Sequence, residues 1–129
     1  MKAYLVIKFK EDNSNQKTIE DISALFKKMN IEIISMARDY EKWGEVKFTP
    51  LELMQKTFQI IDSSDLLIVE FSEKGVGIGI EAGYAYAKQK PIFVIAKEGS
   101  DVSNTLKGIA KDVIFYNNPE ELINKFELR

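Results

Sequence analysis

The sequence contains no cysteine and no histidine among its 129 residues. These absences exclude thiol nucleophiles, Ser-His triads, histidine proton shuttles and zinc sites built from sulfur or imidazole ligands. Carboxylates, lysines, tyrosines, hydroxyls and backbone amides remain for chemistry. A bound metal would have to be a hard cation such as Mg²⁺ held by oxygen atoms, and no carboxylate cluster requires one. We therefore expect neither a metal nor a cofactor.

Net charge and long apolar runs are also scarce. Eighteen Lys and Arg residues stand against 20 Asp and Glu, which leaves a net charge of −2. Such a chain has no global field that would favour nucleic acid or an anionic membrane as a partner. No window approaches the roughly 18 apolar residues of a membrane span, and the apolar run at residues 3–7 is too short for a signal peptide. We expect a cytoplasmic protein.

The hydrophobic share of 45% is enough for one core, and the length is typical of one domain covering residues 1–129. Short apolar runs rich in branched residues indicate strands, and apolar residues at helical spacing indicate helices. The expected strands are 3–9, 31–37, 66–69, 91–96 and 113–116. The expected helices are 17–30, 49–63, 80–89, 103–110 and one opening at 118, with a long loop at 38–48.

Two of the expected helices have clear start signals. Thr49 is an N-cap followed by Pro50, with Glu52 completing a capping box. Asn118 and Glu121 repeat the pattern around a second proline at position 119. These signals fix where the two helices begin.

Regular alternation of strands and helices predicts the fold class: a doubly wound, flavodoxin-like α/β fold with a five-stranded parallel sheet and helices on both faces. Ligands in such folds bind outside the carboxyl ends of the strands. Functional residues are therefore expected in the loops at 8–15, 38–48, 71–81 and 97–105.

Several doubly wound families can be tested at these loops. The P-loop pattern GxxxxGK[ST] is absent, and the acidic residues of a phosphoacceptor receiver do not follow the first and third strands. The stretch Lys8-Phe9-Lys10 gives no hydroxyl-rich loop for FMN. The glycines at 75–79 do not have GxGxxG spacing, and they follow the third strand instead of the first. A tight turn that needs positive φ is an alternative reading of these glycines.

Three segments taken together are more specific. They read DSSDLLIV at 62–69, GIGIEAGYA at 77–85 and KPI at 90–92. This order resembles the central signature of the nucleoside 2-deoxyribosyltransferase family, which includes deoxynucleoside 5′-monophosphate N-glycosidases. The resemblance spans about residues 50–110. It implies a nucleoside or nucleotide as the small-molecule partner, and a homodimer, because sites in the family borrow residues across subunits.

The resemblance also assigns a nucleophile. Glu81 matches the family glutamate that attacks the anomeric carbon and leaves a glycosyl-enzyme, the strategy of retaining glycosidases. Close to a helix N-terminus, this carboxylate is expected to stay ionised. The alternative reading is a first-turn glutamate that only stabilises its own helix.

Further residues are candidates for binding substrate. Gly75, Gly77 and Gly79 would let loop amides approach ribose or phosphate. Tyr84 and Trp43 offer surfaces for stacking a base, although a tyrosine on that helix is as often core. Three charged residues of the loop at 38–48 and one serine complete the set. Arg38, Asp39 and Lys42 would hold phosphate or assist the leaving base, and Ser103 resembles the family serine that contacts phosphate from the neighbouring subunit.

The sequence departs from the family at two places. Lys8-Phe9-Lys10 replaces a Gly-Ser or Gly-Pro element, although a basic pair could meet phosphate. Thr57 replaces an aspartate that positions the sugar or handles a proton. Cleavage or transfer of an N-glycosidic bond through Glu81 is the leading hypothesis. The alternatives are a non-catalytic nucleotide-binding or sensing module of the same fold and a purely structural or interaction domain. The base, the sugar and the choice between hydrolase and transferase stay open.

Overall fold

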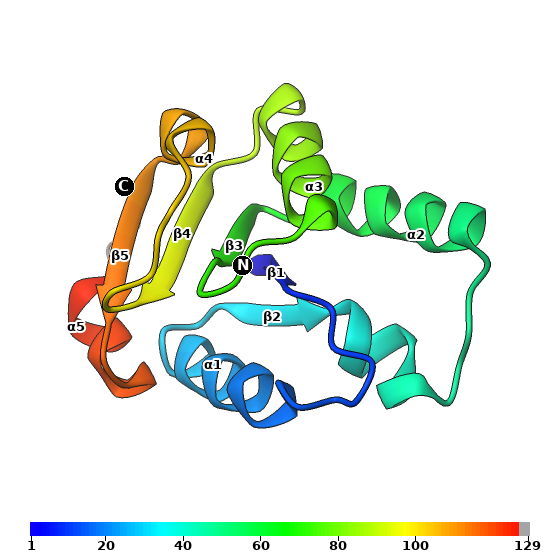
Figure 1. Ribbon diagram of the computed structural model, residues 1–129, viewed down its shortest axis with the longest axis horizontal. Helices are drawn as coiled ribbons and strands as arrows, with labels where there is room; N and C mark the ends of the chain where they lie inside the picture. The colour runs from blue at the N-terminus through cyan, green and yellow to red at the C-terminus, as the bar shows by residue number, and fades with distance from the viewer. Residues whose placement is uncertain (127–129) are drawn as a thin grey trace.

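The computed structural model describes residues 1–126, which form a five-stranded parallel sheet with helices on both faces (Figure 1). The strand order is β2-β1-β3-β4-β5. This arrangement confirms the predicted fold class. The strands are β1 (Lys2–Ile7), β2 (Glu32–Ser35), β3 (Leu66–Glu70), β4 (Ile92–Lys97) and β5 (Asp112–Tyr116). The helices are α1 (Gln16–Lys28), α2 (Pro50–Ser63), α3 (Val76–Ala87), α4 (Asn104–Ile109) and α5 (Leu122–Lys125).

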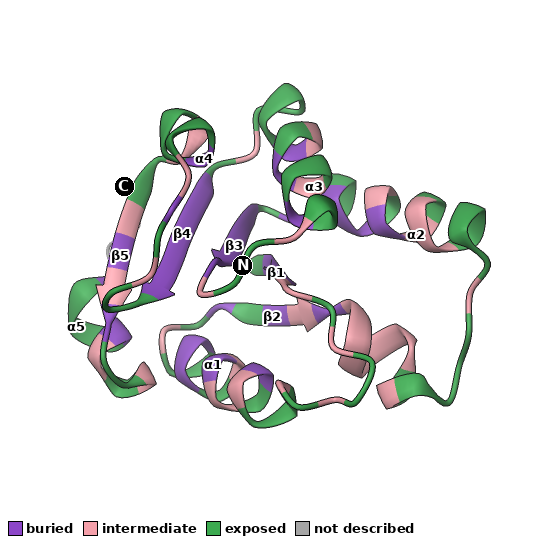
Figure 2. Cartoon of the chain, viewed as in Figure 1, coloured by how far each residue is buried: buried purple, intermediate pink, exposed green. Residues whose placement is uncertain are grey.

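Alternating side chains of the central strands feed two hydrophobic cores, one on each face of the sheet. One core joins the sheet to α1 and α5, for example through Phe26 and Leu122. The other joins it to α2, α3 and α4, for example through Ile61, Ala82 and Leu106. The central strand β3 is buried along its whole length, as its unbroken apolar run predicts (Figure 2).

Both predicted helix starts are present. At α2 the Thr49 hydroxyl accepts a hydrogen bond from the Glu52 amide, and the Glu52 carboxylate accepts one from the Thr49 amide. Asn118 and Glu121 form the second capping box. That box opens a 3₁₀ turn, η3 (Pro119–Glu121), before α5 begins. No helix within residues 1–126 is long and apolar enough to cross a membrane.

The segment 38–48, expected as an irregular loop, is partly helical. A single π-helical turn, η1 (Met36–Tyr40), follows β2, and a 3₁₀ turn, η2 (Lys42–Gly44), follows in turn. Side chains set this path, because the Ser35 hydroxyl accepts a hydrogen bond from the Arg38 amide and Asp39 accepts one from the Ser35 amide. Hydrophobic periodicity carries no signal for such local capping, so the prediction of a loop was wrong here.

Helix α3 begins at Val76, four residues before its predicted start. Gly75 is its N-cap in an extended conformation with φ of −166°, so the reading of the glycines as a turn with positive φ was also wrong. Gly77 and Gly79 lie inside the first turn of the helix. The buried positions Ile78 and Ala82 continue the helical period through the glycines, which add no apolar side chains of their own.

Candidate active site

The central strand pair brings together a tyrosine and a glutamate that are far apart in the sequence. Tyr4 lies in the middle of β1, where it is paired with Ile34 of β2 and Leu67 of β3. Its side chain belongs to the core beneath α2 and α3 and is 2% exposed. The phenol donates a hydrogen bond of 2.8 Å to Oε1 of Glu81 on α3. The predicted nucleophile is therefore fixed by a hydrogen bond from a strand of the sheet.

Glu81 is half-buried, and burial raises the pKa of its carboxyl from about 4.5 to about 7, while the hydrogen bond from Tyr4 acts in the opposite direction. The expectation that the helix dipole keeps Glu81 firmly ionised was wrong. Because α3 starts at Val76, Glu81 lies in the second turn, where the backbone amides already donate within the helix and the dipole has faded. The reading of Glu81 as a first-turn glutamate fails for the same reason.

Thr57 of α2 stands at the position where the family resemblance implies an aspartate. Its side chain is 1% exposed, and its hydroxyl donates a 2.8 Å hydrogen bond to the Leu53 carbonyl. The same hydroxyl interacts with the Tyr4 phenol, an interaction that lowers the Tyr4 pKa. Burial and the neighbouring Glu81 outweigh it and hold that pKa well above its usual value. Tyr4 therefore stays protonated and acts as a hydrogen-bond donor.

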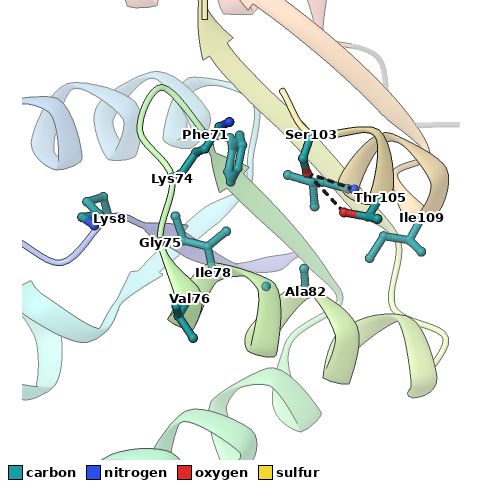
Figure 3. Close-up of a pocket in the computed structure, with 12 residues that line it drawn as sticks. Lys8, Phe71, Lys74, Gly75, Val76, Ile78, Ala82, Ser103, Thr105 and Ile109 are labelled. Carbon is teal, nitrogen blue, oxygen red and sulfur yellow. Dashed lines mark hydrogen bonds between the residues drawn. The ribbon is translucent and has the colours of Figure 1, made fainter. Parts of the chain in front are cut away.

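A cavity of about 640 Å³ lies between the end of β3, the first turns of α3 and helix α4 (Figure 3). Lys8 and Lys74 are the cations among its lining residues, with Lys74 paired to Asp101 at 3.1 Å, and Ser103 and Thr105 supply hydroxyls. Apolar side chains and glycine backbone form the remaining wall. These residues are Phe71, Gly75, Val76, Ile78, Gly79, Ala82, Leu106 and Ile109.

Glycines at the start of α3 shape the edge of this cavity. A Cβ atom on Gly77 or Gly79 would meet nothing within 4 Å among the described residues, so the helix surface there is open. A Cβ atom on Gly75 would come within 3.3 Å of Cδ of Lys8, because the Lys8 side chain packs against the glycine backbone. Ser103 is the N-cap of α4, with its hydroxyl accepting from the Leu106 amide.

Arg38 and Asp39 are engaged in holding the chain together. The Arg38 guanidinium forms an ion pair with Asp39 and donates to the Ser23 hydroxyl and the Ile33 carbonyl, at 2.9, 2.6 and 2.8 Å. It also reaches Glu20 of α1. Proximity of the opposite charge raises the pKa of Arg38 and lowers that of Asp39. These contacts fasten the turn after β2 to α1, and none of them involves Glu81.

The two aromatic residues expected to stack on a base also have structural contacts. Tyr84 stacks on Phe58 of α2 with ring centroids 4.1 Å apart, and its hydroxyl donates to Asp62. Trp43 packs against the core on the α1 face of the sheet, opposite to the face that carries Glu81. Lys42 is exposed and contributes to lowering the pKa of Asp39. The structure brings none of these residues to Glu81.

Sequence reasoning missed Tyr4, Lys74 and Thr105. The tyrosine had a usable signal, because it carries the only hydroxyl in a strand of aliphatic residues, and a buried phenol needs a partner. Lys74 and Thr105 lie in the loops at 71–81 and 97–105, where functional residues were expected, but nothing in the sequence singles them out, since they line one cavity only when α3 and α4 pack. Within residues 1–126, no group of three or more potential ligands could hold a metal ion.

The strand order defines a doubly wound α/β protein, and a cavity lies at the carboxyl ends of its strands. No family model matches the sequence. A Thermofilum pendens protein provisionally named 2′-deoxynucleoside 5′-phosphate N-hydrolase 1 is 24% identical over 133 residues, covering 98% of this chain and 93% of the relative. This full-length similarity confirms the resemblance to the nucleoside 2-deoxyribosyltransferase family and its N-glycosidase members.

Solved structures share the fold over nearly the whole chain. A 2-deoxyribosyltransferase from Bacillus psychrosaccharolyticus superimposes with a TM-score of 0.78 at 15% identity, covering 99% of this chain and 93% of the other. The CMP N-glycosidase BcmB of Clostridium botulinum gives 0.69 at 20% identity, with 97% of each chain covered. At these identities the match describes the architecture.

Proposed function

We propose that the protein is an enzyme that cleaves or transfers the N-glycosidic bond of a nucleoside or nucleoside 5′-monophosphate, with Glu81 as the nucleophile. The observation that carries the proposal is the contact between Tyr4 and Glu81, which presents a half-buried carboxyl with a pKa of about 7 beside the switch point of the sheet. The named activities of the Thermofilum, Clostridium and Bacillus proteins support the same reaction class.

In the proposed reaction, a carboxylate oxygen of Glu81 attacks the anomeric carbon as the bond to the base breaks. The base leaves with the electron pair and takes up a proton from water. The resulting ester is then cleaved by water, which adds hydroxyl to the anomeric carbon and returns Glu81 to the carboxylate form. A second base in place of water would complete a transfer. Ionised Glu81 also stabilises the positive charge that develops on the sugar.

Tyr4 has a positioning role in this scheme. Its hydrogen bond fixes one oxygen of Glu81 and leaves the other for the anomeric carbon. The same hydrogen bond lowers the pKa of Glu81 and so favours the ionised carboxylate, whereas desolvation raises that pKa. Thr57 interacts with the Tyr4 phenol at the position where the resemblance implies an aspartate. Because Thr57 has no carboxyl group to protonate the leaving base, the base takes its proton from another source.

The cavity beside α3 suits the 5′ end of a nucleotide. Lys8 and the amides of the first turn of α3 offer positive charge, and Gly75, Gly77 and Gly79 keep that turn accessible. Ser103 contributes a hydroxyl at the far wall. Arg38, Asp39, Trp43 and Tyr84 are left out of the proposed binding site because their side chains are engaged elsewhere.

Exposed apolar side chains on α3 suit a homodimer contact. Val76 is 84% exposed, Ile80 49% and Tyr86 58%, and Val76 lines the same cavity as Ser103. A second copy of the chain would bury these side chains and bring a further Ser103 towards the site. Sedimentation of the wild type and of Ile80→Lys tests this: a dimer that becomes a monomer in the variant supports the arrangement, and a monomeric wild type contradicts it.

The experiment that tests the reaction is chromatographic detection of free base from a panel of nucleosides and 5′-monophosphates, with Glu81→Ala alongside. Base release by the wild type and its loss in the variant are expected. Unchanged turnover in Glu81→Ala would remove Glu81 as the nucleophile. Thermal stabilisation by a nucleotide without release from any substrate would favour the binding module.

A further inference from the structure

The turn η1 and the cavity lie on opposite sides of the Tyr4–Glu81 contact. Strand β2 leads into η1 and neighbours β1, whereas the cavity is built from the end of β3 and from α3 and α4. Met36 and Tyr40, the first and last residues of η1, pack against the same core as Tyr4, so they lie on the face of the sheet that α3 and Glu81 cover. Across the sheet the order is therefore the cavity, then Glu81 with Tyr4, then η1.

A nucleotide has its parts in the same order: phosphate, anomeric carbon, base. This step rests on the proposed function, which puts the anomeric carbon at Glu81 and the 5′ end at the cavity. The base then extends towards the segment after β2. Single π-helical turns occur frequently at functional sites, because they redirect side chains that a regular helix would place elsewhere.

Glu41 is the residue that follows this turn, and its backbone is firmly held. Its amide donates to the Met36 carbonyl at 2.9 Å, and its carbonyl accepts from the amides of Gly44 and Val46 at 3.0 and 2.9 Å. Its side chain is half-buried, and within residues 1–126 its carboxylate makes no hydrogen bond, although the charge of Lys47 acts on it. The main chain thus presents a carboxylate with free acceptor positions.

Electrostatics relate this carboxylate to the reaction centre. The charge of Glu41 makes a small contribution to the raised pKa of the Tyr4 phenol, after burial and Glu81. Partial burial raises the pKa of Glu41 itself, with Lys47 opposing the shift. A partly desolvated acceptor gains more from an N–H donor than one in open water does.

We propose that Glu41 recognises the exocyclic amino group of the base, so that the enzyme prefers amino-bearing bases such as cytosine or adenine over their keto counterparts. A carboxylate accepts from an amino group, and it repels the carbonyl oxygen that uracil or hypoxanthine presents at the same position. The inference names the substrate class of the proposed site, and it assigns Glu41 a role in binding the base that is separate from bond cleavage by Glu81.

The test compares matched pairs of substrates: CMP with UMP, AMP with IMP, and the corresponding deoxynucleotides. The wild type is expected to show a kcat/KM at least about tenfold higher for the amino member of the accepted pair, from one charge-assisted hydrogen bond. In Glu41→Gln, which keeps the shape, the ratio should fall to about one or reverse, because the amide can donate to a carbonyl. Glu45→Gln, on the exposed side of the same segment, is the matched control and should keep the wild-type ratio.

Equal turnover of both members by the wild type, or a ratio unchanged in Glu41→Gln, would overturn the inference while leaving the reaction class intact. If no substrate releases base, the proposed function fails, and calorimetric binding of the same nucleotide pairs decides the inference separately. Tighter binding of the amino member that is lost in Glu41→Gln would then support the role of Glu41. Equal or absent binding of the pair would overturn it.

Discussion

The phenol of Tyr4 donates a hydrogen bond to the carboxyl of Glu81 across 77 positions of the sequence. Tyr4 comes from the first strand and Glu81 from the third helix, so the contact forms only when α3 has packed onto the sheet. It joins a buried donor, whose own pKa is well above the usual value, to a carboxyl that desolvation makes harder to ionise. The fold therefore sets the charge of the proposed nucleophile.

The first prediction concerns the dependence of activity on pH. Only ionised Glu81 can attack, and its pKa is about 7. We expect kcat/KM to rise with pH, with its midpoint near 7, and to level off above it, because this parameter reports the ionisation of the free enzyme. Measurement with a nucleoside as well as a nucleotide distinguishes the ionisation of Glu81 from that of the substrate phosphate, whose second pKa is about 6.

Tyr4→Phe tests the cause of the midpoint. The hydrogen bond from Tyr4 lowers the pKa of Glu81, so its removal should move the midpoint to higher pH and reduce the rate at pH 7 more than at pH 9. Thr57→Val, which removes a neighbouring hydroxyl without touching Glu81 directly, is the comparison. A midpoint near 4.5 in the wild type would contradict the desolvated site.

The second prediction concerns stability. The folded-state pKa of Glu81 lies above its usual value of 4.5, so the folded protein holds more protons than the unfolded chain between about pH 4.5 and 7. The contribution of Glu81 to stability is present at low pH and is lost as pH rises through 7. Glu81→Gln cannot ionise and keeps an acceptor for Tyr4, and it should raise the Tm at pH 8 by a few degrees. Thermal unfolding at pH 8 and pH 4.5 checks this, since the gain should vanish at the lower pH.

Strand patterns and capping residues made much of this fold predictable. The unbroken apolar run of β3 and the capping box at Thr49 each report a local rule that the tertiary structure keeps. The start of helix α3 could not be predicted in this way, since Gly75, Gly77 and Gly79 have no side chains that would reveal a helical period of apolar residues. Its earlier start moved Glu81 into the second turn and changed the expected pKa from low to high.

The candidate site was predictable only in part. Glu81 follows from a signature, but its partner Tyr4 looks like an ordinary core residue of a strand. Arg38 and Tyr84 have side chains suited to binding a ligand, but Arg38 forms an ion pair with Asp39 and Tyr84 stacks on Phe58. Neither contact has a sequence signal. Charged and aromatic side chains are placed by packing between elements, which the period of a single element does not contain.

The third prediction separates a structural from a binding role for Arg38. Its guanidinium joins the turn after β2 to α1 through Ser23, the Ile33 carbonyl and Glu20. Arg38→Met should lower the free energy of unfolding by about 1 to 2 kcal/mol, because it leaves partly buried acceptors without a donor. The KM for a nucleotide should stay within about twofold of the wild type. Denaturant unfolding and steady-state kinetics check both parts, and a large rise in KM with unchanged stability would return Arg38 to the binding site.

The fourth prediction concerns the 5′-phosphate. Lys8 directly follows β1, packs against Gly75 and lines the cavity beside the start of α3. Lys8→Met keeps the packing of the stem and removes the charge. We expect KM for a nucleoside 5′-monophosphate to rise by about tenfold, which corresponds to one charge-assisted hydrogen bond, while KM for the matching nucleoside stays unchanged.

Steady-state kinetics on a nucleotide and its nucleoside, at low and high salt, measure this difference. Lys107→Met on α4 is the control, because this lysine is exposed and is not among the residues lining the cavity. The wild-type preference for the monophosphate should weaken as salt rises, since a partly exposed charge is screened, and the variant should show little of that dependence. An equal rise in KM for both substrates would mean that Lys8 shapes the cleft through packing, and the charge that selects phosphate would have to come from the amides of α3 and from Lys74.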